Sequence, residues 1–532
     1  MFFTDIIFDL DNTLYNYNCH NIAIELTIKK LSLDYSNKYD DIKSDYDLIS
    51  NKLKYEIGNT ASSHNRTIYF KQVFDKYNFP LCDLMNIVEY YWESYFYNLK
   101  INDGVIQLLK FVKENNIKIH ILSDFTLLEQ LKKLKILNIL EFIDNIITSE
   151  EIGIEKPSLK VFTYCINKLK LNVDKTIFIG DDFEKDILGA NNVGIYAFYY
   201  SNKNLTFNKN YATFNSFIEL LDIFKNIKSS LKELELISKY YGQRFDLVQA
   251  GGGNISIKTN DLMIIKSSGC LLSDVSTISN YTIINNQKLK LEMSRYNNLS
   301  DYILFNGDIP SMETYMHSIL KKYTIHLHPI QIINMFKKQD VLKILFNNSL
   351  IIEYFTPGEE LSDGIMKNYN NNDIIFLLNH GVIFTSDNYN DLFNLIEKCL
   401  NKIEEYLNLN FCKYKYVNDI SNVIGNITYL SEDKIIIDNL QKLKKFKIIF
   451  PDQLIYCGEN ILFIEKLNEC KPSKIIVYND NVYINSENLN KCRHIESVLK
   501  SYLLLDYNNS LSEIDIQKLN NSNMEKYRKN KQ

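Results

Sequence analysis

The sequence has few of the features that would place it in several large classes of proteins. Its nine cysteines are scattered and form no C-x-x-C pair, which favours reduced thiols in a cytoplasmic compartment over a disulfide framework. No run of about 18 apolar residues occurs, so no membrane span is predicted. The net charge is only −5 and there is no basic block, so nucleic acid is not an expected partner.

Targeting signals and turn-forming residues are scarce as well. The segment MFFTDIIF has no basic n-region and carries Asp5, which predicts a strand and not a signal peptide. Seven prolines and 17 glycines occur in 532 residues, while 45% are hydrophobic and 23% charged, which is typical of globular proteins. A chain of this length exceeds what one hydrophobic core supports, so we expect two or three domains.

The first 225 residues alternate apolar strands with helical patterns, the latter at 126–137 and 158–170. This alternation predicts an α/β fold with a parallel, doubly wound sheet. Polar side chains follow the strands directly, at the strand ends where ligands of such sheets bind. They are Asp9, Asp11 and Thr13 after TDIIF, Ser123 and Asp124 in IKIHILSDFT, Lys156 in EEIGIEKPSLKVF, and Asp181 with Asp186 in KTIFIGDDFEKDILGA.

In this order, the four segments resemble the haloacid dehalogenase-like hydrolase superfamily over about residues 1–222. The resemblance implies that Asp9 is a nucleophile that accepts the phosphoryl group as an aspartyl-phosphate. Asp11 would protonate the leaving oxygen and then activate water. Dehalogenases lack that second aspartate, so Asp11 favours a phosphatase, with a phosphomutase as the alternative.

A carboxylate that attacks a phosphate needs nearby cations, because the two groups repel each other. By resemblance, Mg²⁺ would supply one positive charge and Lys156 another. The implied magnesium ligands and their support are Asp9, Asp11 through its carbonyl, Asp181 and Asp186. The residues implied to bind the substrate or its phosphoryl group are Thr13, Ser123 and Asp124.

About residues 15–100, between the first two strands, show mostly helical patterns. An insertion at this place resembles the helical cap of the same family, which closes over small substrates. The expected partners of this part are therefore small phosphorylated metabolites such as sugar phosphates.

The second half contains YTIHLHP, in which two of the chain's eight histidines stand one residue apart. In a strand, His326 and His328 would point to the same side, about 7 Å apart at Cβ, so both could bind one metal ion. The alternative is the solvent-facing side of an amphipathic strand. Taken alone, the pair favours that alternative.

Four other segments bear on that choice. They are LVQAGGGNISIK with Gly253 and Asn254, MIIKSSGCLLSDVS with Ser268 and Gly269, IPSMETYMHSIL with Ser311 and Glu313, and DIIFLLNHGVIF with His380. Together with YTIHLHP they resemble the class II aldolase/adducin family over about residues 231–415. The resemblance implies Zn²⁺ or another divalent cation with three histidine ligands, which leaves a coordination position open for substrate. Those ligands are His326, His328 and His380, with Glu313 as the acid/base.

The same resemblance implies a cradle for a substrate phosphate. Its residues are Gly253, Asn254, Ser268, Gly269 and Ser311. The short sugar-phosphate aldolases have a second serine where this chain has Met312, which departs from the phosphate pattern. The wording QAGGGNIS, the segment YFTPGEEL and the C-terminal tail resemble the longer, rhamnulose-phosphate-aldolase-type members.

Three domains are predicted along the chain. A phosphatase-like domain covers residues 1–225, an aldolase-like domain covers 228–415, and a small α/β extension covers 416–532. The cysteines of the extension, Cys457, Cys470 and Cys492, are expected to be buried thiols rather than ligands. By resemblance to the family aldolases, a homotetramer is expected.

The leading hypothesis is a bifunctional enzyme of sugar-phosphate metabolism. A phosphatase would precede a metal-dependent aldolase that cleaves or forms a C–C bond next to a phosphorylated ketone, with the divalent cation stabilising an enediolate. One alternative is that the second domain is a dehydratase, as in methionine salvage, or a 4-epimerase. Another is an adducin-like interaction module without catalysis, which the retention of three histidines and Glu313 disfavours.

Overall fold

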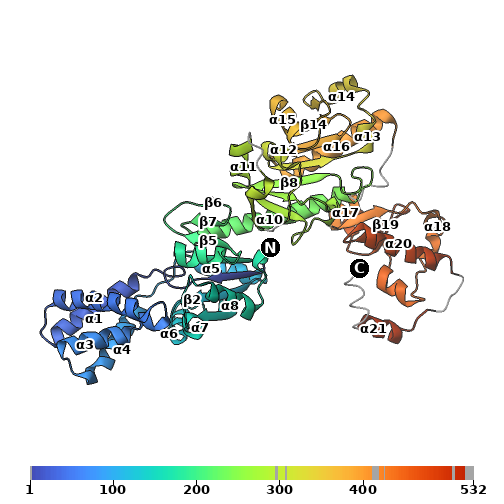
Figure 1. Cartoon of the computed structure of the whole chain (residues 1–532). Coiled ribbons are helices and arrows are strands. Elements are labelled where there is room, and N and C mark those ends of the chain that lie inside the picture. Colours follow the sequence, from blue (N-terminus) through green and yellow to red (C-terminus); the bar gives the residue numbers. More distant parts are fainter. Residues whose placement is uncertain are drawn as a thin grey trace. The chain divides into compact units, whose positions relative to one another are not determined.

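The structure is a computed structural model that describes residues 3–293, 298–305, 308–409, 419–424, 426–505 and 510–521. Its strands form three sheets, which contain β1–β7, β8–β15 and β16–β19 (Figure 1). The α/β class predicted from the sequence is confirmed. Within the described residues, no helix has both the length and the apolar character needed to cross a membrane.

The first sheet has the order β3-β2-β1-β4-β5-β7-β6, and its neighbours are parallel except for β6 and β7. The predicted doubly wound, parallel sheet is therefore confirmed. Its strands are β1 (Asp5–Phe8), β2 (Lys118–Ser123), β3 (Asn145–Thr148), β4 (Thr176–Gly180), β5 (Tyr196–Tyr200), β6 (Thr206–Phe207) and β7 (Tyr211–Phe214).

The helices between these strands are α5 (Val105–Glu114), α6 (Leu127–Ile136), α7 (Ser149–Ile152), α8 (Leu159–Leu169) and α9 (Gly189–Asn191). Helices α6 and α8 match the helical patterns at 126–137 and 158–170. The buried side chains of Leu122, Phe162 and Phe178 pack in one apolar cluster, which joins α8 to the sheet. The sheet order then brings the carboxyl ends of β1, β2 and β4 side by side.

The expected helical insert follows β1. It consists of α1 (Asn18–Asp34), α2 (Tyr39–Ile57), α3 (Arg66–Tyr77) and α4 (Leu84–Tyr97), which Figure 1 shows together in blue. Helix α1 packs against α4, and α2 packs against α3. The side chain of Asn65 caps α3 by accepting hydrogen bonds from the backbone of Thr67 and Ile68.

The second sheet has the order β11-β10-β9-β8-β12-β15-β14-β13. Strand β12, which carries His326, lies between β8 and β15 and is antiparallel to both. The strands are β8 (Asn254–Thr259), β9 (Leu262–Lys266), β10 (Tyr281–Asn285), β11 (Ile303–Phe305), β12 (Tyr323–Leu327), β13 (Leu350–Ile352), β14 (Ile374–Leu377) and β15 (Gly381–Ser386). The helices near them in sequence include α10 (Phe217–Gly242), α12 (Thr314–Ile319), α15 (Glu359–Asn368) and α16 (Tyr389–Leu407).

The third sheet has the order β16-β19-β18-β17, which confirms the small α/β extension. Its elements are β16 (Ile427–Leu430), α18 (Lys434–Asp438), β17 (Leu462–Ile464), β18 (Ile475–Tyr478), β19 (Asn481–Ser486) and α20 (Leu489–Leu503). Cys457 and Cys492 are buried in its apolar core, as expected, while Cys470 is half-buried.

Candidate functional site

The carboxylates predicted from the first half converge at the carboxyl ends of β1 and β4. Asp9 follows β1, Asp181 follows β4, and Asp186 lies one turn further on. Each of the three offers a carboxylate oxygen within 4.8 Å of the other two. Oxygen ligands at such spacing suit a hard divalent cation such as Mg²⁺.

Lys156 neutralises part of this charge from within the protein. Its Nζ donates to Asp9 Oδ1 and to Asp186 Oδ1, both at 2.6 Å, and the residue is only 3% exposed. Burial alone would lower the pKa of Lys156, but the charges of Asp186 and Asp9 outweigh it and hold that pKa well above its usual value. The lysine is therefore a permanent cation beside the predicted nucleophile.

Burial raises the pKa of Asp9 well above its usual value, and the charges of Asp186, Asp181 and Asp11 add to this effect against the opposing charge of Lys156. Several carboxylates thus share one small buried region. A second cation in that region would restore the charged form that a nucleophile requires. The residues present therefore fit a bound magnesium ion.

Asp11 is held by two residues of α6 that the sequence reasoning missed. Lys133 Nζ donates to Asp11 Oδ1 at 2.7 Å and Gln130 Nε2 donates to Asp11 Oδ2 at 3.1 Å. The Tyr15 hydroxyl also donates to Oδ1. Burial raises the pKa of Asp11, but the charge and hydrogen bond of Lys133 outweigh it, so the pKa lies below its usual value. The three-residue spacing of Gln130 and Lys133 on a helix after β2 was the available signal.

The other predicted phosphatase residues are also at this edge of the sheet. Ser123 ends β2 and accepts a hydrogen bond of 2.6 Å from Gln130 Nε2. The hydroxyl of Thr13 donates to Asp181 Oδ1 at 3.0 Å, so it holds a carboxylate in place. Asp124 Oδ1 accepts from the backbone N–H of Lys156 at 2.9 Å, which fixes the segment that carries the lysine.

A cavity of about 740 Å³ opens over these residues. It is lined both by the carboxylate site and by residues of the helical insert. The lining from the insert and the segments beside it includes Tyr17, His64, Arg66, Tyr91, Trp92 and Tyr95. Arg66 and His64 are among the lining residues that the sequence analysis did not name as site residues. The cavity is large enough for a small phosphorylated metabolite.

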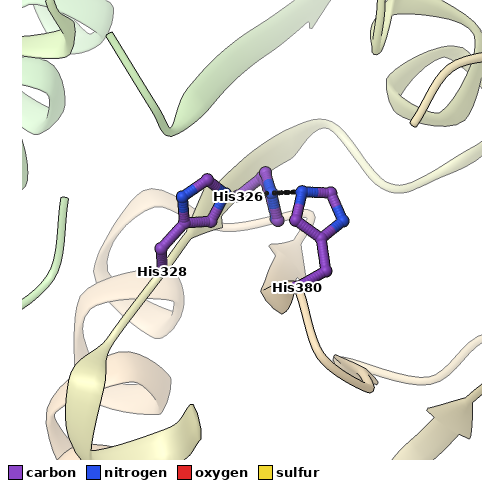
Figure 2. A group of neighbouring side chains, drawn as sticks. All are labelled: His326, His328 and His380. Carbon is purple, nitrogen blue, oxygen red and sulfur yellow. Dashed lines mark hydrogen bonds between the residues drawn. The ribbon is translucent and has the colours of Figure 1, made fainter. Parts of the chain in front are cut away.

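The three predicted histidines also converge. His326 Nε2 lies 2.8 Å from His328 Nε2 and 3.3 Å from His380 Nε2. Figure 2 shows the rings of His328 and His380 on either side of His326. The ring centroids are 4.7, 4.7 and 5.1 Å apart. The pair in YTIHLHP therefore does not form the solvent-facing side of a strand, since His326 is fully buried.

The positions of the three Nε2 atoms suit metal coordination better than hydrogen bonds between the rings. His326 Nδ1 lies 3.1 Å from the carbonyl of Val382, which assigns the proton to Nδ1 and leaves a lone pair on Nε2. One lone pair cannot accept good hydrogen bonds from both neighbouring rings. A divalent cation would satisfy all three Nε2 atoms at once.

Burial keeps the histidines neutral. It lowers the pKa of His326 to about 3, and the charge of His380 adds to this effect. Burial also lowers the pKa of His328 to about 3, together with the charges of His326 and His380. Only the neutral form of imidazole binds a metal, so the ligand form is already present at neutral pH.

Glu313 lies beside this group, as predicted. Its Oε1 is 3.5 Å from His326 Nε2 and 3.8 Å from His380 Nε2. Asn254 Nδ2 donates to the other oxygen, Oε2, at 3.4 Å. The Glu313 side chain is 11% exposed and so has limited access to solvent. It can exchange a proton with a molecule bound next to the histidines.

The predicted phosphate cradle is assembled only in part. Gly253 has a φ of 74°, and a Cβ there would lie 3.3 Å from the His326 carbonyl, so the position requires glycine. Ser311 Oγ accepts a hydrogen bond of 3.3 Å from the backbone N–H of Glu313. Ser268 and Gly269 are exposed in the turn after β9. They take no part in the hydrogen bond that joins Asn254 to Glu313.

A buried ion pair supports the chain around His328, and the sequence reasoning missed it. Arg244 Nε and Nη2 donate to the two carboxylate oxygens of Asp246 at 3.1 and 2.8 Å. The backbone carbonyls of Leu247 and Asp246 accept from the N–H groups of His328 and Ile330. The signal was the charged pair in GQRFD, just before the glycine-rich segment.

Two family models match the chain. The haloacid dehalogenase-like hydrolase model matches residues 6–194, and the Class II Aldolase and Adducin N-terminal domain model matches residues 234–407. Together they span the two sites described above.

Curated relatives match the first of these parts. The chain is 31% identical over 196 residues to the ribulose-1,5-bisphosphate 5-phosphatase of Halopiger xanaduensis, covering 36% of this chain and 82% of that protein. It is 31% identical over 239 residues to the glyceraldehyde 3-phosphate phosphatase of Methanocaldococcus jannaschii, covering 42% of this chain and 97% of that protein.

Solved structures resemble each part separately. The magnesium-bound HAD-hydrolase YfnB of Bacillus subtilis aligns with a TM-score of 0.34 and 20% identity, over 42% of this chain and 99% of that one. The N-terminal class II aldolase domain of a conserved Thermoplasma acidophilum protein aligns with a TM-score of 0.30 and 21% identity, over 33% of this chain and 93% of that one.

Proposed function

The chain belongs to the haloacid dehalogenase-like hydrolases, to which it joins a class II aldolase/adducin domain, and from this premise we propose that it is a bifunctional enzyme of sugar-phosphate metabolism. The first site would hydrolyse a phosphate monoester. The second would cleave or form a C–C bond next to a phosphorylated ketone. The observation that carries the proposal is that both predicted sets of side chains converge, Asp9 with Lys156 and the three histidines with Glu313.

In the proposed phosphatase, Asp9 attacks phosphorus and forms an aspartyl-phosphate. Lys133 favours the charged form of Asp11, which is the form that takes a proton from the water that hydrolyses the intermediate. To protonate the leaving oxygen in the first step, Asp11 would take up a proton when the substrate binds. Lys133 and Gln130 hold both oxygens of Asp11 and so fix its orientation toward the cavity. Lys156 keeps Asp9 beside a positive charge while the negatively charged phosphate approaches.

Asp9, Asp181 and the carbonyl of Asp11 are the residues that would hold Mg²⁺, with Asp186 supporting them. When bound, the ion would supply positive charge against the transferring phosphoryl group. Thr13 orients Asp181 for this role through its hydroxyl. Ser123 would hydrogen-bond the phosphoryl oxygens, and Asp124 would hold the Lys156 segment.

The names of the relatives support a small sugar phosphate as the substrate of this first site. They include a ribulose-1,5-bisphosphate 5-phosphatase and several glyceraldehyde 3-phosphate phosphatases. The cavity of about 740 Å³ suits molecules of this size.

In the proposed aldolase, His326, His328 and His380 would hold Zn²⁺ or another divalent cation. When bound, the cation would stabilise the negative charge of an enediolate. Glu313 moves the proton, and Asn254 fixes its second oxygen. Gly253, Asn254, Ser268, Gly269 and Ser311 would bind a substrate phosphate.

The boundaries predicted from the sequence remain part of this proposal. The phosphatase domain would cover residues 1–225, the aldolase-like domain 228–415, and its extension 416–532. The enzyme would work in the cytoplasm as a homotetramer, which light scattering of the purified protein tests directly.

A screen of phosphorylated metabolites with the purified protein tests the proposed function. Released phosphate and released dihydroxyacetone phosphate are read separately, in the parent and in the Asp9→Asn and His328→Ala variants. We expect Asp9→Asn to remove only phosphate release and His328→Ala only C–C cleavage. A product with an intact carbon skeleton from the histidine site would identify a dehydratase or an epimerase instead.

A further inference from the structure

Arg66 is a buried cation in the helical insert and lines the same cavity as Asp9. It is the first residue of α3 and is 7% exposed. Its Nη1 donates to the carbonyl of His64, and its Nη2 donates to the hydroxyl of Tyr17 at 3.0 Å. Its Nε has no hydrogen-bond partner among the residues that the structure describes.

The lysines that line this cavity each have carboxylate partners. Lys156 pairs with Asp9 and Asp186 at 2.6 Å, Lys133 with Asp11 at 2.7 Å, and Lys185 with Asp124 and Glu155 at 3.2 and 3.3 Å. For Arg66, no carboxylate oxygen lies within 4.0 Å anywhere in the described part of the chain. A buried charge without a counter-ion is strongly unfavourable, and the neutral acceptors on Tyr17 and His64 compensate it only in part.

The neighbours of Arg66 do not supply the missing negative charge. The Tyr69 ring lies under the guanidinium, 5.3 Å from ring centroid to Cζ. Tyrosine is neutral at pH 7, and burial raises the pKa of Tyr69 further, although the charge of Arg66 opposes this. Burial and the charge of Arg66 lower the pKa of His20 to about 2, so this ring is neutral as well.

The position of Arg66 at the start of α3 makes its uncompensated positive charge still less favourable. A cation in the first turn of a helix faces the positive end of the helix dipole, where anions are favoured. Both the burial of Arg66 and its place at the start of α3 therefore favour an anion beside it. Because Arg66 lines the substrate cavity, an anionic group of the substrate can reach it.

The free edge of the guanidinium has the shape that such a group needs. Arg244, elsewhere in the chain, uses Nε and Nη2 to bind both oxygens of the Asp246 carboxylate. On Arg66 the same edge carries the unpartnered Nε and an Nη2 that donates to a neutral group, the Tyr17 hydroxyl. This pair of donors matches two oxygens of a phosphate or carboxylate.

We propose that Arg66 binds a second anionic group of the substrate, at the end remote from the phosphate that Asp9 attacks. The inference rests on the proposed phosphatase and deepens it. The preferred substrates are doubly anionic: a sugar carrying two phosphates, or a phosphate monoester carrying a carboxylate. In both, the guanidinium fork receives two anionic oxygens and the buried charge gains its counter-ion.

Phosphate release from matched substrates tests the proposal. The probes are a pentulose bisphosphate, the same pentulose with one phosphate, a phosphorylated hydroxy acid, and p-nitrophenyl phosphate, which has no second anion. We expect the parent to prefer the bisphosphate or the hydroxy acid to the monophosphate by at least about tenfold in kcat/KM. Whichever of the two is preferred identifies the second group as phosphate or carboxylate.

Arg66→Gln should lower kcat/KM for the preferred substrate by about 10- to 100-fold, mainly through KM, because a charged hydrogen-bonding partner is lost. Hydrolysis of p-nitrophenyl phosphate should change by less than about threefold. Arg66→Lys, which keeps the charge but not the fork, should retain part of the preference. Lys71→Gln, an exposed position on the same helix, is the matched control and should change none of these values.

Thermal melting separates binding from folding. If Arg66 serves to bind a ligand, replacing it should leave the melting temperature unchanged or raise it. A parent without any preference for doubly anionic substrates would overturn the proposal, whatever the variants do. The proposal would also be overturned if both Arg66 variants lost activity equally toward all four substrates. If the parent releases phosphate from none of the probes, the proposed phosphatase itself fails and this inference fails with it.

Discussion

The two sites solve the problem of buried polar groups in different ways. Around Asp9, carboxylates are paired with permanent cations of the protein, since Lys156 and Lys133 donate to Asp9 and Asp11. Around His326, the three imidazoles are neutral and Glu313 brings the charge. The first site therefore neutralises part of its negative charge with lysines of the protein, whereas the second brings three neutral Nε2 atoms close together. Metal dependence should differ between them accordingly.

The largest expected effect comes from replacing Asp9, the proposed nucleophile. Asp9→Asn should abolish phosphate release, because an amide cannot form the aspartyl-phosphate. The activity at the histidines should be unchanged. Phosphate assays on any substrate from the metabolite screen check this, and retained turnover in the variant would contradict the assignment of Asp9.

At the histidines, we expect metal binding and turnover to separate. His328→Ala leaves two ligands, so metal affinity should collapse. Glu313→Gln should keep the metal but lower turnover by about 10²–10⁴-fold, as is typical of losing a general acid/base. Metal analysis of the purified proteins, with one transition-metal equivalent per chain expected in the parent, distinguishes the two. Normal metal content in His328→Ala would show that the histidines are not ligands.

A third prediction concerns the ion pairs of Lys156 with Asp9 and Asp186, which distinguish the first site from the second. Lys156→Met removes the cation between Asp9 and Asp186, which should cost about 3–5 kcal/mol of stability because two buried carboxylates lose their partner. Added Mg²⁺ should recover part of the loss. Lys185→Met is the control. The Lys185 side chain is 37% exposed, so its replacement should cost much less stability.

Urea unfolding with and without Mg²⁺ measures both variants. An equal loss for Lys156→Met and Lys185→Met would mean that the buried pairing is not what balances this site.

The smallest expected effect concerns a histidine outside both candidate metal sites. His20 hydrogen-bonds to the Tyr91 hydroxyl at 2.8 Å, and burial with the charge of Arg66 lowers its pKa to about 2. The unfolded chain takes up this proton near pH 6.5 while the folded one does not, so stability should fall as the pH drops below about 6.5. The slope is at most about 1.4 kcal/mol per pH unit.

His20→Asn should remove that slope and keep a polar group for Tyr91. Melting curves of parent and variant at pH 7 and pH 5 compare the two directly. An identical pH dependence in both proteins would contradict a buried, neutral His20.

Residues whose placement depends on local repeats could be predicted from the sequence. Asp9, Asp181 and Ser123 each stand at the end of an apolar strand, and parallel strands bring such ends to one edge of a sheet. Strand alternation predicted that His326 and His328 share a side, and their Nε2 atoms do lie 2.8 Å apart, although His328 directly follows β12 and is not part of it. For these, the pattern along the chain is enough to indicate a shared site, and the α/β class follows from the same alternation.

Only the tertiary structure decided which helix faces contribute residues to the sites. That Lys133 and Gln130 reach Asp11 depends on α6 following β2, which pairs with β1 in the sheet order. That Arg66 enters the cavity of Asp9 depends on how α3 packs within the insert. A helix period tells which side chains share a face but not what that face meets, because the partner is set by contacts distant in sequence. Charge balance, which distinguishes the two sites, is such a property.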